Sequence, residues 1–160
     1  IVQIRTKKIA VVNLMGRVFF REDLDDPFRK IDEILEEVGK ETKNIFVDFH
    51  TEVTSEIVAM KYYLDGRVSA LVGTHTHVPT QDFHVTNKGT FFVSDSGMVG
   101  PKDSILGVDP DIIIQKYLTQ IPVRHEVAES DEAEVNAIYL EIENDGKISS
   151  FEKIYEFISL

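Results

Sequence analysis

Short apolar runs separated by polar turns recur along the first hundred residues and predict the strands of a buried sheet. The first run is almost continuously apolar, as expected for a parallel strand that is covered on both faces. Each run is followed by Gly, Pro or charged residues, which predict where the strand ends. The four predicted strands are residues 8–14, 44–49, 68–72 and 90–94.

Two segments between these strands carry apolar side chains at the spacing of one helix face. The first predicted helix starts at Pro27, directly after two aspartates, and stops at Gly39. The second covers residues 55–64, with Thr54 or Ser55 as its cap. Because strands and helices alternate, the sequence predicts an α/β fold in which helices pack on a sheet.

The last third of the chain combines one helix with strands that pair as neighbours. A helix is predicted at residues 110–118, and three strands are predicted at 123–128, 135–143 and 148–155. The Asn-Asp-Gly turn at residues 144–146 joins the last two strands in a hairpin. We expect residues 1–160 to form a single domain of mixed α/β type.

Composition and charge exclude several classes of protein. The chain has no cysteine, so a metal site would need His, Asp, Glu or Asn as ligands. The net charge of −11 disfavours duplex nucleic acid as a partner, although bound metal ions would let the protein accept a small anionic substrate. No apolar run approaches the roughly 20 residues that span a bilayer. We therefore expect a cytoplasmic protein without a membrane partner.

Three of the five histidines follow directly after predicted strands. His50 ends the strand at 44–49, and His75 and His77 come shortly after the strand at 68–72. Ligands of open α/β sheets bind beyond the carboxyl ends of the strands. Residues two apart in extended backbone point to the same side, so a His-x-His pair can aim two imidazoles at one place or at two neighbouring metal ions. The three histidines are therefore candidate metal ligands.

Each of these residues also has a structural interpretation. An isolated His-x-His pair is more often part of a surface loop than of a metal site. Asp48 and His50 could form a simple hydrogen-bonded pair, or Asp48 could cap a turn. In a metal site, Asp48 or Glu52 would instead orient His50. The two interpretations of His50 are evenly balanced, whereas Glu56, in the first turn of a helix, is interpreted as structural.

The glycine-rich loop at residues 97–107 offers a second group of candidates. Its sequence, GMVGPKDSILG, lacks the Gly-Lys-Ser/Thr ending of a phosphate-binding P-loop. Lys102 and Ser104 could nevertheless meet a phosphate, and a compact structural turn is the alternative. His84 and His125 have no supporting context and are interpreted as structural or surface residues.

Four segments carry a distinctive pattern, namely DFHTEVTSE at 48–56, LDGRVSA at 64–70, VGTHTHV at 72–78 and SDSGMVGP at 94–101. In this order they resemble the YmdB-like bacterial metallophosphoesterases. The resemblance runs from about Lys8 to the final hairpin, and it implies an α/β fold of the calcineurin-like type, a four-layer αββα sandwich that here lacks its N-terminal portion. It also implies an enzyme that hydrolyses cyclic nucleotides, most notably 2′,3′-cyclic ones.

By this resemblance, His50, His75 and His77 are histidine ligands of a centre with two Fe, Mn or Zn ions. The implied mechanism is in-line attack on a small phosphodiester by metal-bound hydroxide. The family's Asp, Glu and Asn ligands and its general acid belong to an N-terminal half that these 160 residues do not match. The residues expected close to the metals or the substrate are Asp48, Glu52, Thr74, Lys102 and Ser104.

Two other interpretations stay open. Without the N-terminal ligands, the chain would be a non-catalytic interaction or oligomerisation module. It could also be a different metallohydrolase built on a related sandwich, such as a capsule-polymer synthesis protein, although residues 65–67 and 97–101 argue against that. The predicted strand at 8–14 should lack a neighbour on one side, so we expect a homo-oligomer or association with an N-terminal half.

Overall fold

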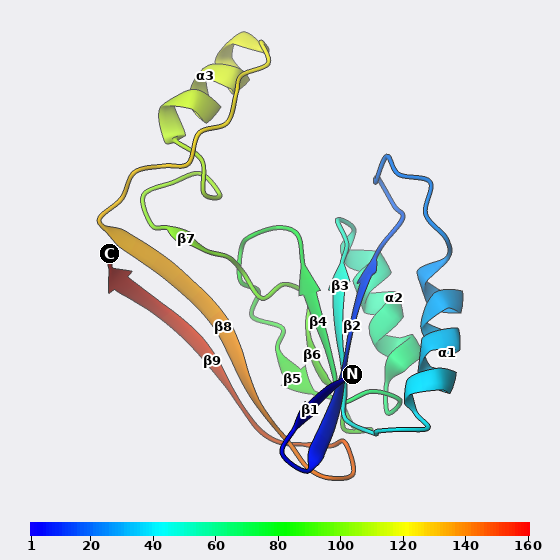
Figure 1. Ribbon diagram of the computed structural model, residues 1–160. Coiled ribbons are helices and arrows are strands. Elements are labelled where there is room, and N and C mark those ends of the chain that lie inside the picture. Colours follow the sequence, from blue (N-terminus) through cyan, green and yellow to red (C-terminus); the bar gives the residue numbers. More distant parts are fainter.

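A six-stranded sheet with the order β1–β2–β3–β4–β6–β5 forms the centre of the molecule (Figure 1). The computed structural model describes residues 1–160. The four inner strands are parallel: β2 (Lys7–Met15), β3 (Ile45–His50), β4 (Ala70–Thr74) and β6 (Phe91–Val93). Two short strands pair antiparallel with them at the edges: β1 (Val2–Ile4) and β5 (His84–Val85). The predicted α/β class is confirmed.

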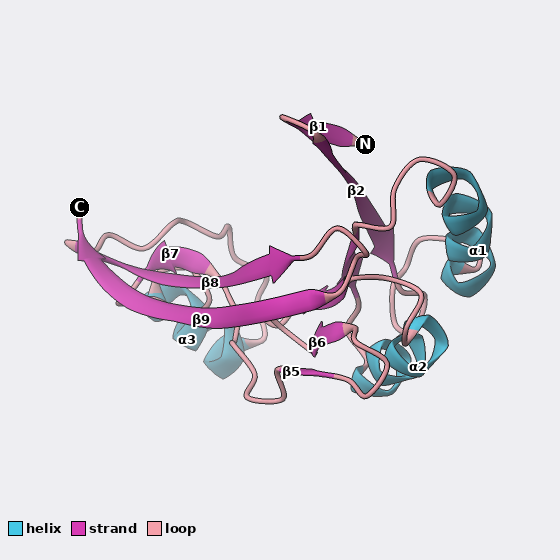
Figure 2. Cartoon of the chain, turned by 90° about the horizontal axis from the view of Figure 1, so that it is seen from below, coloured by secondary structure: helices cyan, strands magenta, loops and turns pink.

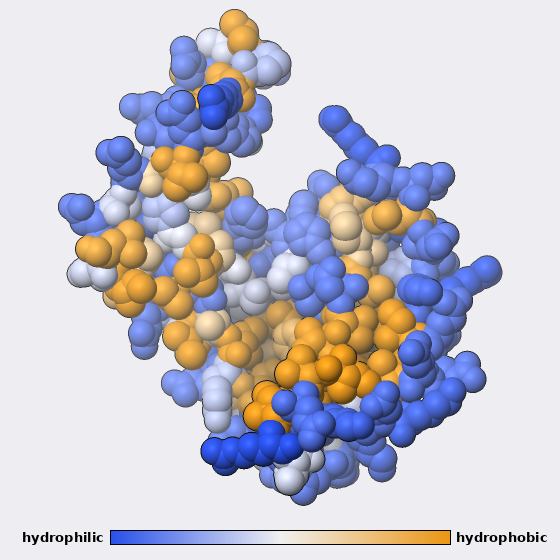
Figure 3. Space-filling model, viewed as in Figure 1, coloured by the Kyte–Doolittle hydropathy of each residue, from blue (hydrophilic) through white to orange (hydrophobic).

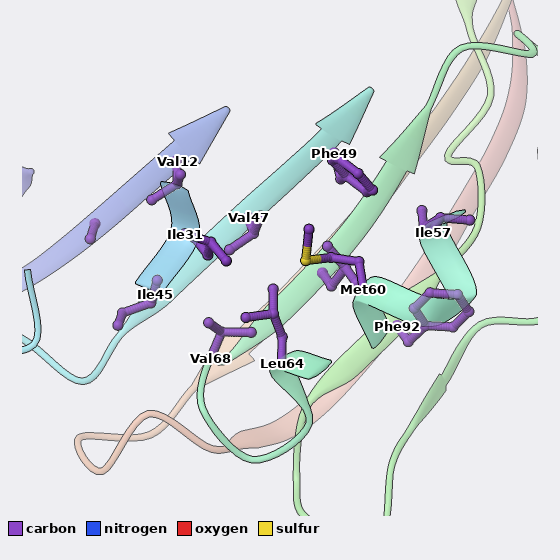
Figure 4. Close-up of a cluster of buried hydrophobic side chains, with 12 residues drawn as sticks. Val12, Ile31, Ile45, Val47, Phe49, Ile57, Met60, Leu64, Val68 and Phe92 are labelled. Carbon is purple, nitrogen blue, oxygen red and sulfur yellow. The ribbon is translucent and has the colours of Figure 1, made fainter. Parts of the chain in front are cut away.

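Two helices cover one face of this sheet, α1 (Pro27–Val38) and α2 (Thr54–Leu64). Asp26 caps α1, because its carboxylate accepts hydrogen bonds from the backbone N–H groups of Phe28 and Arg29. The apolar side chains of both helices interdigitate with those of β2, β3 and β4, and burial of this cluster is the main stabilising contact of the fold (Figure 4). Its largest buried members include Phe49, Met60 and Leu64.

The other face of the central sheet carries a second, antiparallel sheet, made of β7 (Val99–Pro101), β8 (Glu132–Ile142) and β9 (Ile148–Ser159). Ile138, Leu140 and Ile148 pack against the buried β4 and β6 side chains. Helix, sheet and sheet therefore form three layers, and α3 (Pro110–Thr119) projects away from them (Figures 1 and 2). None of the helices has the length and apolar character needed to cross a bilayer.

Two local predictions are wrong. Residues 123–128 form no strand but one isolated bridge between Val108 and Val127, because this segment is largely exposed and has no sheet edge beside it. Neither Thr54 nor Ser55 caps α2, since Val53 occupies the N-cap position and no side chain bonds to the helix start. The hairpin of β8 and β9 is confirmed.

The outer edge of β2 is covered only over its first half. β1 pairs with residues 7–9, so the later residues of β2 have no strand on that side. Val11 is 58% exposed on β2, and Val2 and Ile4 on β1 are similarly exposed. Figure 3 shows apolar surface over this part of the molecule. The uncovered edge and apolar face expected from the sequence are present, and association through them stays a prediction.

Candidate functional site

The register of the parallel strands brings polar side chains into adjacent rows on the face opposite α1 and α2. Asn13 of β2 lies beside Asp48 of β3, and in the next row His50 lies beside Thr74 of β4. All of these residues lie near the carboxyl ends of their strands, where open α/β sheets bind ligands. The site therefore opens between the two sheets, while the helices cover the opposite face.

A continuous hydrogen-bond chain runs through this site. Asp48 accepts from Asn13 Nδ2 at 2.7 Å and from the Thr74 hydroxyl at 3.0 Å. His50 Nδ1 lies 3.1 Å from Thr74 Oγ1. Because the Thr74 proton is donated to Asp48, its oxygen accepts from His50 Nδ1–H. In neutral His50 this leaves the lone pair on Nε2, the nitrogen that would bind a metal ion.

His75 completes the chain on the open side. Its Nδ1 lies 3.1 Å from His50 Nε2, and its Nε2 lies 3.9 Å from a Glu52 carboxylate oxygen. The ring of Phe20 packs against both imidazoles, with centroid distances of 5.8 Å to His50 and 5.6 Å to His75. The predicted residues Asp48, His50, Glu52, Thr74 and His75 are thus brought together. Asp48 reaches His50 only through Thr74, and Glu52 lies beside His75.

His77 lies apart from the other two histidines. Its Nδ1 is 3.3 Å from the backbone carbonyl oxygen of Leu106, and its ring is exposed. His75, His77 and Leu106 all have positive φ values, of 146°, 64° and 54°. Side chains this large rarely adopt such a backbone, and strain of this kind concentrates at functional sites. The backbone is therefore strained both in the loop that carries His75 and His77 and in the glycine-rich loop at Leu106.

Asp95 fixes the turn that carries the histidine pair. This buried carboxylate accepts from the backbone N–H and the hydroxyl of Thr76, at 2.7 and 2.8 Å, and from Gly97 N–H at 2.8 Å. It follows β6, as His50 follows β3, so its place at the sheet edge was recognisable in the sequence. We infer that Asp95 positions the turn that carries His75 and His77.

Glu56 holds a second segment of the site. Its buried carboxylate accepts from Arg17 N–H at 2.9 Å, Val18 N–H at 3.4 Å and the Thr51 hydroxyl at 2.8 Å. These bonds anchor the connection that leads to Phe20. This arrangement agrees with the structural interpretation of Glu56. However, its carboxylate accepts hydrogen bonds from this connection and not from the N–H groups at the start of α2.

Replacing Glu56 with glutamine is expected to lower the free energy of unfolding by about 1 to 2 kcal/mol, because an amide nitrogen would replace one of two accepting oxygens. Amide hydrogen exchange at Arg17 and Val18 should accelerate in parallel. Glu36→Gln on the exposed side of α1 is the matched control and should leave both quantities unchanged. Equal behaviour of the two variants would show that Glu56 does not anchor this segment.

A cavity of about 630 Å³ adjoins the loop that carries His77. Lys102 and Ser104, the candidates from the glycine-rich loop, both line it. Lys102 donates to Glu132 at 2.6 Å, and this hydrogen bond raises the pKa of the lysine. The Ser104 hydroxyl donates to the Pro101 carbonyl at 2.6 Å and accepts from Gly107 N–H at 3.0 Å. Ser104 therefore shapes the loop, which was the structural alternative.

The residues present fit part of a metal site. His50 and His75 supply converging imidazole nitrogens of the kind that bind Fe, Mn or Zn. The structure gathers no group of three or more His, Asp or Glu side chains in coordinating positions, and His77 faces the Leu106 carbonyl. Neutral imidazoles also bring no negative charge to offset two cations. These residues fit as the nitrogen ligands of a centre that needs carboxylates from elsewhere.

Sequence reasoning missed several residues of this region. Asn13 could be found only once the pairing of β2 with β3 was known, because its partner Asp48 is 35 residues away. Phe20 lies in an irregular connection with no periodic pattern. Lys153 and Tyr155 of β9 line the cavity, but a strand pattern alone does not show which sheet they face.

The fold and the site define an α/β protein with a histidine-bearing sheet edge between two sheets. The sequence profile of the YmdB-like protein family matches residues 1–154, and the chain belongs to that family. It is 48% identical over 141 residues to the 2′,3′-cyclic-nucleotide 2′-phosphodiesterase of Bacillus subtilis (strain 168). That match covers 88% of this chain and 53% of the relative. The chain thus spans about half the length of this relative.

Two solved structures are similar over most of the chain. A hypothetical protein from Thermus thermophilus superposes with a TM-score of 0.89 at 36% identity, covering 98% of this chain and 60% of that one. A protein from Mycoplasma pneumoniae described as a novel phosphatase gives a TM-score of 0.85 at 32% identity, covering 93% and 53%.

Proposed function

We propose that the protein containing these residues is a metal-dependent phosphodiesterase that hydrolyses cyclic nucleotides, with the 2′,3′-cyclic type as preferred substrate. The observation that carries this proposal is the His50–His75 pair, oriented through Thr74 by Asp48 at the carboxyl edge of the sheet. The name of the Bacillus subtilis relative supports the reaction and the substrate class. The phosphatase description of the Mycoplasma pneumoniae structure supports the hydrolase class.

We propose further that the complete fold is a four-layer αββα sandwich of the calcineurin-like type. Three layers are present in these residues, namely α1 with α2, the central sheet and the sheet of β7 to β9. The match covers only 53% of the Bacillus subtilis relative, and the part of such a protein outside the match would supply the remaining layer and a strand beside the free part of β2. It would also supply the carboxylate ligands and the general acid.

In this proposal His50, His75 and His77 hold two Fe, Mn or Zn ions. The ions would supply positive charge that draws the phosphodiester to a protein of net charge −11 and activates the attacking water. Asp48 and Thr74 keep the lone pair of His50 on Nε2, the nitrogen that faces His75, and Phe20 shields both imidazoles from solvent on one side. His77 must turn from the Leu106 carbonyl to join them.

The proposal is tested with the purified protein loaded with Mn²⁺ and offered 2′,3′-cyclic AMP, 3′,5′-cyclic AMP and p-nitrophenyl phosphate. We expect the 2′,3′-cyclic diester to be opened fastest, as water adds to phosphorus and one ring P–O bond breaks to leave a monoester. A chelator should remove the activity. A protein that binds metal and leaves every diester intact would contradict the proposal.

A non-catalytic module is the second candidate for these 160 residues taken alone. The observation that favours it is the lack of any coordinating group of three His, Asp or Glu side chains. The metal content of the same preparation separates the two candidates. Close to two metal ions per chain supports the enzyme, and a metal-free protein that still forms defined oligomers supports the module.

A further inference from the structure

The cavity beside His77 has walls from four separate parts of the chain. The β4–β5 loop contributes His77 and Gln81, the glycine-rich loop contributes Met98 and Lys102, and β8 and β9 form the remaining wall. Its volume of about 630 Å³ is in the range of small-ligand sites and is ample for a nucleotide. Figure 3 shows the surface hollowed between the hairpin and the central sheet.

Part of the lining of this cavity is aromatic and apolar. Tyr155 of β9 lines it together with Met98 and Leu106. Tyr155 is 54% exposed, so it is accessible to a ligand, and its ring packs edge-on against Phe157 with a centroid distance of 5.3 Å. An aromatic ring in a cavity that a thioether also lines offers a surface on which a nucleobase can stack.

Two cations and one carboxylate give the rest of the cavity its polarity. Lys102 and Lys153 both line it. Lys153 lies two residues before Tyr155 on the same face of β9, and its Nζ is 3.4 Å from the Thr80 carbonyl oxygen. Glu134 accepts from Asn136 Nδ2 at 2.7 Å and has acceptor capacity left for a ribose hydroxyl or a base amino group.

We propose that this cavity binds the nucleoside part of the substrate, with the base stacked on Tyr155 and a phosphate oxygen close to Lys153. The inference rests on the proposed function, because His77 belongs both to the histidine run and to the cavity wall. A ligand whose phosphate lies at the histidines has its base directed along the β4–β5 loop toward β9. The cavity thereby makes the enzyme favour nucleotides over phosphodiesters that carry no base.

The test is NMR titration of the protein with adenosine 3′-monophosphate in the presence of a chelator, so that neither metal nor turnover is needed. We expect the largest shifts at Met98, Lys153 and Tyr155. Tyr155→Ala should weaken nucleotide binding by roughly 10-fold, as expected for the loss of one stacked base, while Tyr155→Phe keeps it. Tyr139→Ala is the control, because Tyr139 is 52% exposed and does not line the cavity.

Inorganic phosphate serves as the probe without a base. Its binding should be unaffected by Tyr155→Ala and weakened by Lys153→Gln. The inference would be overturned if nucleotide shifts no cavity residue in the unsubstituted protein. It would also be overturned if Tyr155→Ala and Tyr139→Ala weaken nucleotide binding equally. Hydrolysis of bis(p-nitrophenyl) phosphate is measured separately on portions of the same preparations that contain no chelator and are loaded with Mn²⁺. If hydrolysis persists while either negative result is obtained, the base-binding proposal is wrong and the phosphodiesterase proposal stands.

Discussion

Replacing His50 with alanine is expected to lower the metal affinity of the protein by more than about 100-fold, because loss of an outer-shell partner alone costs roughly 10- to 100-fold. His50 is the best-oriented candidate ligand, since Thr74 and Asp48 fix its ring through hydrogen bonds of 3.1 and 3.0 Å. His75→Ala should have a similar effect. Isothermal titration with Mn²⁺ measures the affinity, and hydrolysis of 2′,3′-cyclic AMP should fall with it.

His84→Ala is the matched control for these variants. His84 is also a histidine on the central sheet, but its Nδ1 lies 2.6 Å from the Asp82 carbonyl oxygen, on the edge strand β5. Its replacement should leave metal affinity and hydrolysis unchanged. If His50→Ala and His84→Ala bind Mn²⁺ equally well, His50 is no ligand and the proposed centre is wrong.

Gly73→Ala should lower the free energy of unfolding by about 3 kcal/mol or more, at the upper end of the cost of overpacking. A Cβ at this position would lie 1.9 Å from the Ser94 backbone oxygen and 2.3 Å from Ile57 Cδ1. The Ser94 contact is to backbone, so it can be relieved only by moving the strands apart. Urea unfolding monitored by circular dichroism measures the change.

The same substitution should also disturb the site, because Gly73 precedes His75 and its carbonyl accepts from Ser96 N–H at 2.9 Å. Gly100→Ala in β7 is the control. Its Cβ would find only Met98 Sδ, at 3.8 Å, so the free energy of unfolding should change by less than about 0.5 kcal/mol. Equal stability of the two variants would mean that the close approach of β4 to Ser94 is not a constraint on the fold.

The long elements could be predicted from the sequence because local pattern and tertiary burial agree there. The apolar run at 8–14 forms β2, where Ala10 and Val12 are buried against the helices, and Pro27 and Gly39 mark the ends of α1 as expected. The short strands β1, β5 and β7 have two or three residues each, too few to show a period. The segment at 123–128 has the composition of a strand but no neighbour to pair with.

For the site too, the sequence could predict residues that have a local signal but not residues whose role depends on tertiary contacts. His50 and His75 were recognisable because each follows directly on a buried strand, and the structure brings them together. The roles of Asn13 and Tyr155 depend on which strands are neighbours and which face each presents, and these are tertiary facts. Extended geometry predicted that His77 points to the same side as His75. The positive φ of His77 breaks that geometry and places it toward Leu106.

The most direct test of the metal-centre proposal is a ¹⁵N NMR spectrum of the histidine side chains recorded during titration with Zn²⁺. The five histidines provide their own control, because His84 and His125 lie outside the proposed site. We predict that the ring nitrogens of His50, His75 and His77 shift together at stoichiometric metal while those of His84 and His125 stay in place. If the first three do not move, or all five move alike only at large excess of Zn²⁺, these histidines are not a metal site.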